Sequence, residues 1–193
     1  MTQWQSTRPA KRRKLRAWGR VGIQALPLAL VAMSLVAIRL TFHFYLDLVA
    51  VHGASCAPTL IEGDYLIARK LKGQTRPIKR GEIVMISGAG VSMLKRVIGL
   101  PGEDILLRDG RVYIDGRQLP ESYLDARRGW TRQTDWPTTA PDSERVGLAG
   151  FFVMGDNRDA SADSRSFGPI PSDDIAARVL FRVWPMSRIS RLS

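Results

Sequence analysis

Two hydrophobic patterns divide the chain near residue 47. Residues 21–38 carry no charged side chain, and as a helix they extend about 27 Å, close to the hydrocarbon thickness of a bilayer. After Arg39, residues 40–46 are again apolar and aromatic, so the Arg39 side chain can extend to the interface beside an aromatic belt. We therefore predict one transmembrane helix over residues 21–46.

Beyond this segment the apolar runs shorten to the length of β-strands. Residues 64–69 and 82–86 are short apolar runs, each opened by a glycine–acid pair, as strands bounded by turns are. Residues 105–108 and 111–114 flank Asp109-Gly110, and a two-residue Asp-Gly loop strongly predicts a β-hairpin. A second Asp-Gly pair follows, and residues 117–119 are expected to pair back.

The last third of the chain contains an irregular stretch between further strands. Residues 120–149 hold three prolines, two tryptophans and many charges without a period, which is typical of a surface excursion. Residues 150–154 and 176–184 return to strand composition. The chain should then be mostly β, with an antiparallel sheet core and a small inserted β subdomain. We assign the core to residues 50–105 and 150–193, and the insertion to about 106–149.

The net charge of +11 is concentrated at one end. Residues 1–20 hold seven basic side chains and no acidic one, which leaves +4 for the rest. Such a segment stays in the cytoplasm, so we predict a cytoplasmic basic segment over 1–20 and an extracytoplasmic domain over 47–193. Neither zinc-finger spacing nor a base-stacking pattern accompanies the charge, so no nucleic-acid partner is expected. A cleavable secretory signal is the alternative, but the apolar run exceeds the usual core of about 7 to 15 residues.

Ser55 is a candidate nucleophile. It lies in a segment of small residues, 53–58, that lets the backbone come close to an extended peptide; an ordinary turn serine is the alternative. A serine needs a base, and the histidines of the chain are His43 and His52. His43 lies among aromatic residues at the expected membrane surface. His52 is three residues from Ser55, and this spacing does not exclude it as the base.

Lys95 is the other candidate base. Burial beside apolar groups lowers the pKa of a lysine by up to several units, which makes the amine a proton acceptor near neutral pH. Lys95 is surrounded in sequence by apolar residues, and strand alternation directs Met93, Lys95 and Val97 to one face. The alternative is a solvated lysine on an edge strand.

Residues 155–165 form a polar turn after an apolar strand. Three aspartates suggest a calcium loop, but counting from Asp159 places Ser164 where glycine is required and Ile170 where the bidentate glutamate belongs. We therefore expect no metal site. Cys56 is the single cysteine, so the chain forms no internal disulfide and its stability must come from packing.

Together, in this order behind an apolar N-terminal segment, three stretches resemble the bacterial type I signal peptidases. They are Gly53-Ala54-Ser55-Cys56-Ala57-Pro58-Thr59-Leu60, the stretch that begins Lys95-Arg96-Val97-Ile98-Gly99, and Gly155-Asp156-Asn157-Arg158 with Ser161 to Arg165. The resemblance runs from about residue 21 to the C-terminus. It implies Ser55 as nucleophile, Lys95 as general base, Ser161 as the residue that orients the lysine, and an Asp163–Arg165 ion pair that braces the site.

The sequence departs from the family pattern at the nucleophile. Family members carry methionine where this chain has Cys56, and many place a serine where Gly53 stands, although glycine also occurs there in Gram-positive members. The Ser55 N–H is then expected to form the oxyanion hole with a second donor that the sequence does not identify. Gly53, Ala54, Cys56 and Pro58 are candidates for the substrate pocket.

The resemblance implies a membrane-bound serine endopeptidase that removes signal peptides from exported preproteins through an acyl-enzyme. It implies no cofactor, and its partners are preproteins and the lipid bilayer. The location is the cytoplasmic membrane, with one span and the catalytic domain outside. Alternatives are a dedicated peptidase for a pilin or conjugation component, a self-cleaving repressor, and an inactive membrane-tethered binding module. The repressor is disfavoured because a DNA-binding domain is absent, and the sequence leaves the oligomeric state open.

Overall fold

The computed structural model describes residues 15–71, 77–88, 91–124, 146–147 and 149–192. The chain divides into two units, Met1–Phe44 and Tyr45–Ser193. Most of the predicted basic segment, and the excursion over 125–145, lie outside the described residues.

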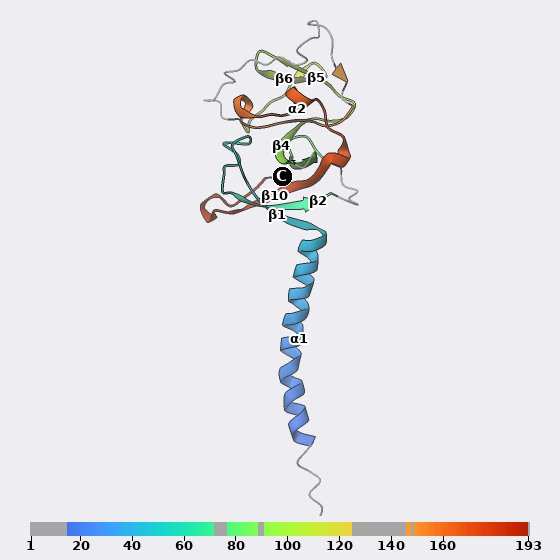
Figure 1. Cartoon of the computed structure of the whole chain (residues 1–193), viewed down its shortest axis with the longest axis vertical. Helices are drawn as coiled ribbons and strands as arrows, with labels where there is room; N and C mark the ends of the chain where they lie inside the picture. Colours follow the sequence, from blue (N-terminus) through green and yellow to red (C-terminus); the bar gives the residue numbers. More distant parts are fainter. Residues whose placement is uncertain (1–14, 72–76, 89–90, 125–145, 148, 193) are drawn as a thin grey trace, which may run out of the picture. The chain divides into compact units, whose positions relative to one another are not determined.

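The first unit contains one helix, α1 (Leu15–Phe44), within the part that the structure describes (Figure 1). Its segment Leu26–Phe44 has a mean hydropathy of 1.7 and is long and apolar enough to cross a membrane. The helix ends at Phe44, and Leu46 begins the first strand. The apolar segment expected over 21–46 is thus divided between a helix and the start of a sheet.

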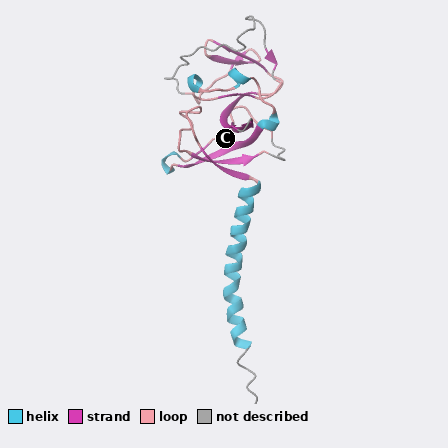
Figure 2. Cartoon of the chain, in the orientation of Figure 1, coloured by secondary structure: helices cyan, strands magenta, loops and turns pink. Residues whose placement is uncertain are grey.

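The second unit is built around a seven-stranded antiparallel sheet, counted over the described residues (Figure 2). Its strand order is β1-β2-β10-β3-β4-β9, with β11 paired to β10. The strands are β1 (Leu46–Ala50), β2 (Tyr65–Lys70), β3 (Ile83–Gly88), β4 (Val91–Gly99), β9 (Phe152–Met154), β10 (Ile175–Trp184) and β11 (Ser190–Arg191).

A second sheet of four strands contains the predicted hairpin. Its order is β7-β6-β5-β8, from β5 (Asp104–Arg108), β6 (Arg111–Ile114), β7 (Arg117–Gln118) and β8 (Val146–Gly147), and in Figure 1 β5 and β6 lie at the opposite end of this unit from β1 and β2. Asp109 and Gly110 have φ angles of 51° and 67°. Two successive positive φ values fit the tight turn that matches strand twist, so the hairpin prediction is confirmed.

Apolar side chains from both sheets form the core. Ile98, Phe152 and Met154 of the larger sheet pack with Ile105 and Val112 of the smaller one. Two further clusters lie along the larger sheet, and one of them includes Cys56 and Leu60. The prediction of a mostly antiparallel β fold behind one apolar helix is confirmed by these elements. The insertion begins in the structure with β5, since this strand belongs wholly to the second sheet.

Candidate active site

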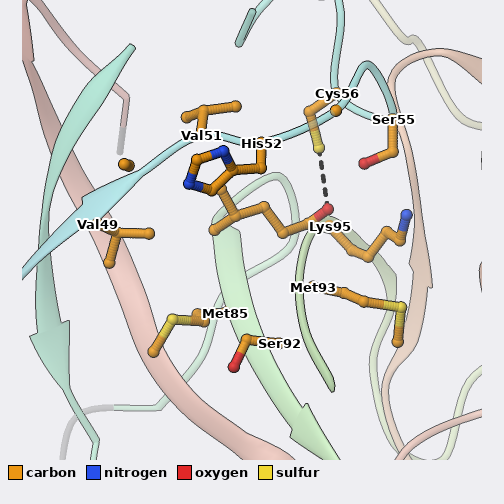
Figure 3. A pocket seen from close by; sticks show the side chains of 12 residues that line it. Val49, Val51, His52, Ser55, Cys56, Met85, Ser92, Met93 and Lys95 are labelled. Atoms are coloured by element: carbon orange, nitrogen blue, oxygen red, sulfur yellow. Dashed lines mark hydrogen bonds between the residues drawn. The ribbon is translucent and has the colours of Figure 1, made fainter. Parts of the chain in front are cut away.

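A cavity of about 220 Å³ lies between β1, the turn that follows it, and strands β3 and β4 (Figure 3). Both Ser55 and Lys95 are among its lining residues. The lining consists otherwise of apolar and small side chains with one imidazole: Val49, Ala50, Val51, His52, Gly53, Cys56, Met85, Ser92, Met93 and Leu94.

Ser55 lies in a tight turn, residues 53–60, which we call the Ser55 turn. The Ala57 N–H donates to the Ala54 carbonyl at 3.1 Å, and the Leu60 N–H donates to the Cys56 carbonyl at 2.8 Å. Gly53 has a φ of 81°, a conformation that favours glycine. The chain thereby leaves β1 and reverses direction, with Ser55 half-buried on the cavity wall.

Lys95 extends from β4, where it pairs with Val84 of β3. The residue is 3% exposed, and its Nζ donates to Ser161 Oγ at 3.0 Å. Burial lowers the pKa of the Lys95 amine below its ordinary value; the nearby Cys56 and Asp163 oppose this shift, and Arg165 adds to it. The structure thus favours the buried-lysine interpretation over a solvated edge lysine, and it brings Ser161 to the amine.

The residues that follow β9 form the polar turn, residues 155–165, against the Ser55 turn. Asn157 joins the two turns, because its N–H donates to the Ser55 carbonyl at 2.9 Å and its Nδ2 donates to the Ala54 carbonyl at 3.1 Å. Gly155 makes the approach possible. A Cβ at this position would lie 2.3 Å from both the Ser55 carbonyl oxygen and Ser161 Oγ. The Ser55 turn and the polar turn therefore meet at Gly155, where a side chain would collide with both.

Asp163 and Arg165 form a two-pronged ion pair, with Arg165 Nε 2.8 Å from Asp163 Oδ1 and Nη2 2.9 Å from Oδ2. Asp163 is fully buried, and it also accepts from the Gly155 N–H at 3.0 Å. Burial raises the pKa of this carboxyl, but the hydrogen bonds and charge of Arg165 and the Gly155 N–H outweigh burial and hold the pKa below its usual range. The pair closes the polar turn around Ser161, because Arg165 Nη2 also donates to the Ser161 carbonyl.

Cys56 faces the protein interior. The residue is 3% exposed, and its Sγ donates to the Leu94 carbonyl at 3.1 Å, the dashed line in Figure 3. Burial and the nearby Asp156 raise the pKa of the thiol, while Lys95 acts in the opposite direction. Cys56 is therefore a neutral, packed side chain that ties the Ser55 turn to β4.

Only some of the other residues proposed from the sequence line the cavity. Gly53 and Cys56 line the cavity, whereas Ala54 and Pro58 are not among its described lining residues; their carbonyls accept from Asn157 and Arg188. His52 is exposed and lines the cavity, and Figure 3 shows its ring within it. His43 belongs to α1, in the other unit.

Sequence reasoning missed the residues that hold the polar turn in place. Arg96 and Asp156 form a buried two-pronged pair, Nε to Oδ1 at 2.7 Å and Nη2 to Oδ2 at 2.6 Å. Removing one partner of such a pair costs about 3 to 5 kcal/mol, because it leaves a buried charge uncompensated. Each partner is adjacent in sequence to a site residue, Lys95 or Gly155. That adjacency, together with opposite charge, was the available signal.

Comparisons with known proteins agree on one family. The family described as "Signal peptidase, peptidase S26" matches residues 23–184. Signal peptidase IB of Staphylococcus aureus is 30% identical over 167 residues, which cover 81% of this chain and 87% of that protein. A probable signal peptidase I-2 of Synechocystis is 32% identical over 148 residues, 72% of this chain and 64% of that protein. A crystal structure of a signal peptidase I from Enterococcus faecalis is 31% identical, with a TM-score of 0.44, and covers 54% of this chain and 98% of that one.

Proposed function

The chain belongs to the signal peptidase family, peptidase S26, and on this basis we propose that it removes signal peptides from exported preproteins with Ser55 as nucleophile and Lys95 as general base. The observation that carries the proposal is the environment of the amine. Lys95 is buried, its pKa is lowered by that burial, and Ser161 is its hydrogen-bond partner, while Ser55 lines the same cavity.

The substrate would bind as an extended strand. Strand β1 is at the edge of the sheet, and β9 pairs with β4 only at Arg96, Val97 and Gly99 among the described residues. Among the described residues, the stretch of β4 before Arg96 therefore has no strand partner other than β3, and its Leu94 carbonyl accepts from Cys56 Sγ beside the cavity. A peptide lying between these edges gains main-chain hydrogen bonds, and its side chains enter the lined cavity. The resemblance to type I signal peptidases further implies small substrate side chains at the first and third positions before the scissile bond.

The reaction follows from these roles. Ser55 Oγ attacks the scissile carbonyl carbon while its proton passes to the neutral Lys95 amine. The tetrahedral intermediate collapses, the ammonium returns the proton to the leaving nitrogen, and an ester to Ser55 remains. Water then attacks that ester, Lys95 again accepts a proton, and the carboxylate product leaves as Ser55 regains its hydrogen. Ser161 holds the lone pair of the amine in the required direction.

The N-terminal apolar helix and the family together indicate a membrane-anchored enzyme. We propose a single span in the cytoplasmic membrane with residues 1–20 inside and residues 47–193 outside. The seven uncompensated basic residues of the first 20 support this orientation, because such segments are retained in the cytoplasm.

Cleavage of a purified preprotein by the purified full chain in detergent tests the proposal. Ser55→Ala and Lys95→Ala should each abolish cleavage in a folded protein, since one lacks the nucleophile and the other its base. Lys95→Arg should also fail, because a guanidinium stays charged. His52→Ala is the control and should cleave. Near-parental turnover in either alanine variant, or an inactive His52→Ala, would refute the dyad; an inactive parent would favour the binding module.

A further inference from the structure

The segment Glu121 to Tyr123, which we call the Glu121 clip, contacts two arginines of the active-site region. It follows β7 of the smaller sheet, and the ring of Tyr123 packs against the core cluster shared by both sheets. Arg158 of η1 (Arg158–Ala160) forms an ion pair with Glu121, with Nη1 donating to Oε2 at 3.2 Å and Nη2 to Oε1. The guanidinium carbon of Arg96 lies 4.1 Å from the centre of the Tyr123 ring.

These contacts are shielded from water. The side chains of Arg158 and Glu121 are 3% and 10% exposed, and that of Arg96 is 7% exposed. Tyr123 Oη donates to Glu121 Oε1 at 2.6 Å, and burial together with the Glu121 charge raises the pKa of Tyr123 well above its usual range, so this hydroxyl stays protonated. A buried arginine without its charge partner is strongly unfavourable, so Glu121 holds the Arg158 guanidinium in one geometry. The Tyr123 ring packs against the guanidinium of Arg96, whose charge partner is Asp156.

Both arginines contact the first residues of the polar turn, and Arg158 is itself part of that turn. Arg158 Nε donates to the Gly155 carbonyl at 3.0 Å, and the Arg158 carbonyl accepts from Arg165 Nη2 at 2.6 Å. Arg96 binds Asp156, the residue after Gly155. The clip therefore reaches the first residues of the polar turn through two separate guanidinium groups, and it reaches the Asp163–Arg165 pair through one of them.

The geometry points to Glu121 and Tyr123 as positioning residues of the reaction: through Arg158 and Arg96 they hold the polar turn so that Ser161 aims the Lys95 amine. This inference rests on the proposed function. It gives the smaller sheet a part in catalysis without contact with the substrate, because the Glu121 clip is not among the described residues that line the cavity.

Loss of the clip should therefore act on the amine rather than on substrate binding. The groups that act on the Lys95 amine are the Cys56 thiol of the Ser55 turn, and Asp163 and Arg165 of the polar turn. If the polar turn loosens, water reaches the amine, its desolvation falls, and its pKa rises toward the ordinary value. The expected signature is a lower kcat with a nearly unchanged KM, and an acid limb of the pH–rate profile displaced to higher pH.

The test uses the full chain in detergent micelles with a purified preprotein. Glu121→Ala and Tyr123→Leu should lower kcat by at least about 10-fold with KM changed by less than about 3-fold. Tyr123→Phe keeps the ring under Arg96 and should retain most of kcat, and Glu121→Gln keeps an acceptor and should recover part of it. Glu103→Ala is the matched control, because Glu103 forms an ion pair with Arg80 and none of its described hydrogen bonds is made to the polar turn.

A second readout does not depend on activity. Lysine labelled with ¹³C at Cε is followed by NMR, with the Lys95 signal assigned by its loss in Lys95→Arg, and the amine pKa should rise in Glu121→Ala and Tyr123→Leu. Unchanged kcat and unchanged amine titration in these folded variants would overturn the inference, as would a rise in KM alone or equal effects in Glu103→Ala. If Glu121→Ala does not fold, the Tyr123→Leu and Tyr123→Phe pair decides. An inactive parent would refute the proposed function, while the NMR titration would still decide the inference.

Discussion

At the scale of single residues, the proposed base Lys95 predicts how activity depends on pH. In the proposed mechanism its amine must be neutral to accept the Ser55 proton, and burial lowers its pKa below the ordinary value of 10.5. Activity should be full above the lowered pKa and should disappear as the pH falls through it, because the amine then takes up a proton. A kcat/KM profile against pH measures this limb.

Ser161→Ala should lower kcat by about 100-fold in a folded protein, since the Lys95 amine then loses the hydrogen-bond partner that orients it.

A profile without an acidic limb, or a Ser161→Ala enzyme at parental rate, would contradict these roles.

The lowered pKa of Lys95 also affects the stability of the fold, which should decrease, as activity does, when the pH falls. Between the lowered and the ordinary pKa the unfolded chain binds more protons at Lys95 than the folded one does, so this residue lowers stability progressively as the pH falls through that window.

Cys56 follows the proposed nucleophile in the sequence, and the structure places its thiol in the protein interior. Only 3% of the residue is exposed, and Sγ donates a hydrogen bond to the Leu94 carbonyl. A bulky maleimide should therefore not reach the thiol and should leave the native enzyme active. Cys56→Met should be active, and Cys56→Ser should keep most activity. Activity assays after maleimide treatment check this. Inhibition of the parent that is absent in Cys56→Met would show instead that the thiol is reachable.

At the scale of elements, strand β4 contributes side chains to the site from both of its faces. Alternation directs Lys95 to the cavity and its neighbour Arg96 to Asp156 and Tyr123. One strand therefore carries the proposed base and also a side chain that anchors the polar turn. The same turn contacts the Ser55 turn through Asn157, so the relative positions of the two turns depend on a short set of hydrogen bonds.

The approach of these two turns predicts the effect of a single methyl group. Gly155→Ala should lower kcat/KM by at least about 100-fold, because the new Cβ would overlap the Ser55 carbonyl and Ser161 Oγ, and one turn must move. Gly88→Ala is a matched control, since a Cβ there meets nothing within 4 Å. Preprotein cleavage by both folded variants gives the comparison. Equal activity of the two would show that the turns tolerate separation.

At the scale of the whole molecule, the orientation in the membrane decides whether the enzyme meets its substrate. Protease added to intact spheroplasts should digest the chain after Asp47 and spare the first twenty residues. Epitope tags at the two ends, detected by immunoblot, distinguish the fragments. Protection of the C-terminal tag, with accessibility confirmed after detergent lysis, would reverse the orientation.

Most elements of the β domain could be predicted from local pattern. The hairpin at Asp109-Gly110 was predictable because an Asp-Gly pair tolerates two positive φ angles, and the paired strands alternate in burial. The end of the helix was less well defined, since residues 45 and 46 are as apolar as a membrane segment. Pairing of Leu46 with Arg69 in the sheet, a contact across 23 residues, decided that boundary.

By itself, the sequence determined the kinds of residue available: one apolar helix, short strands between turns, a serine among small residues, a lysine among apolar ones, and a polar turn. These properties are local, so composition and spacing reveal them. Only the tertiary structure decided that the Lys95 amine bonds to Ser161, that Gly155 lies against Ser55, and that Glu121 reaches Arg158. Burial and pairing depend on strands distant in sequence, and a pKa depends on what those strands bring together.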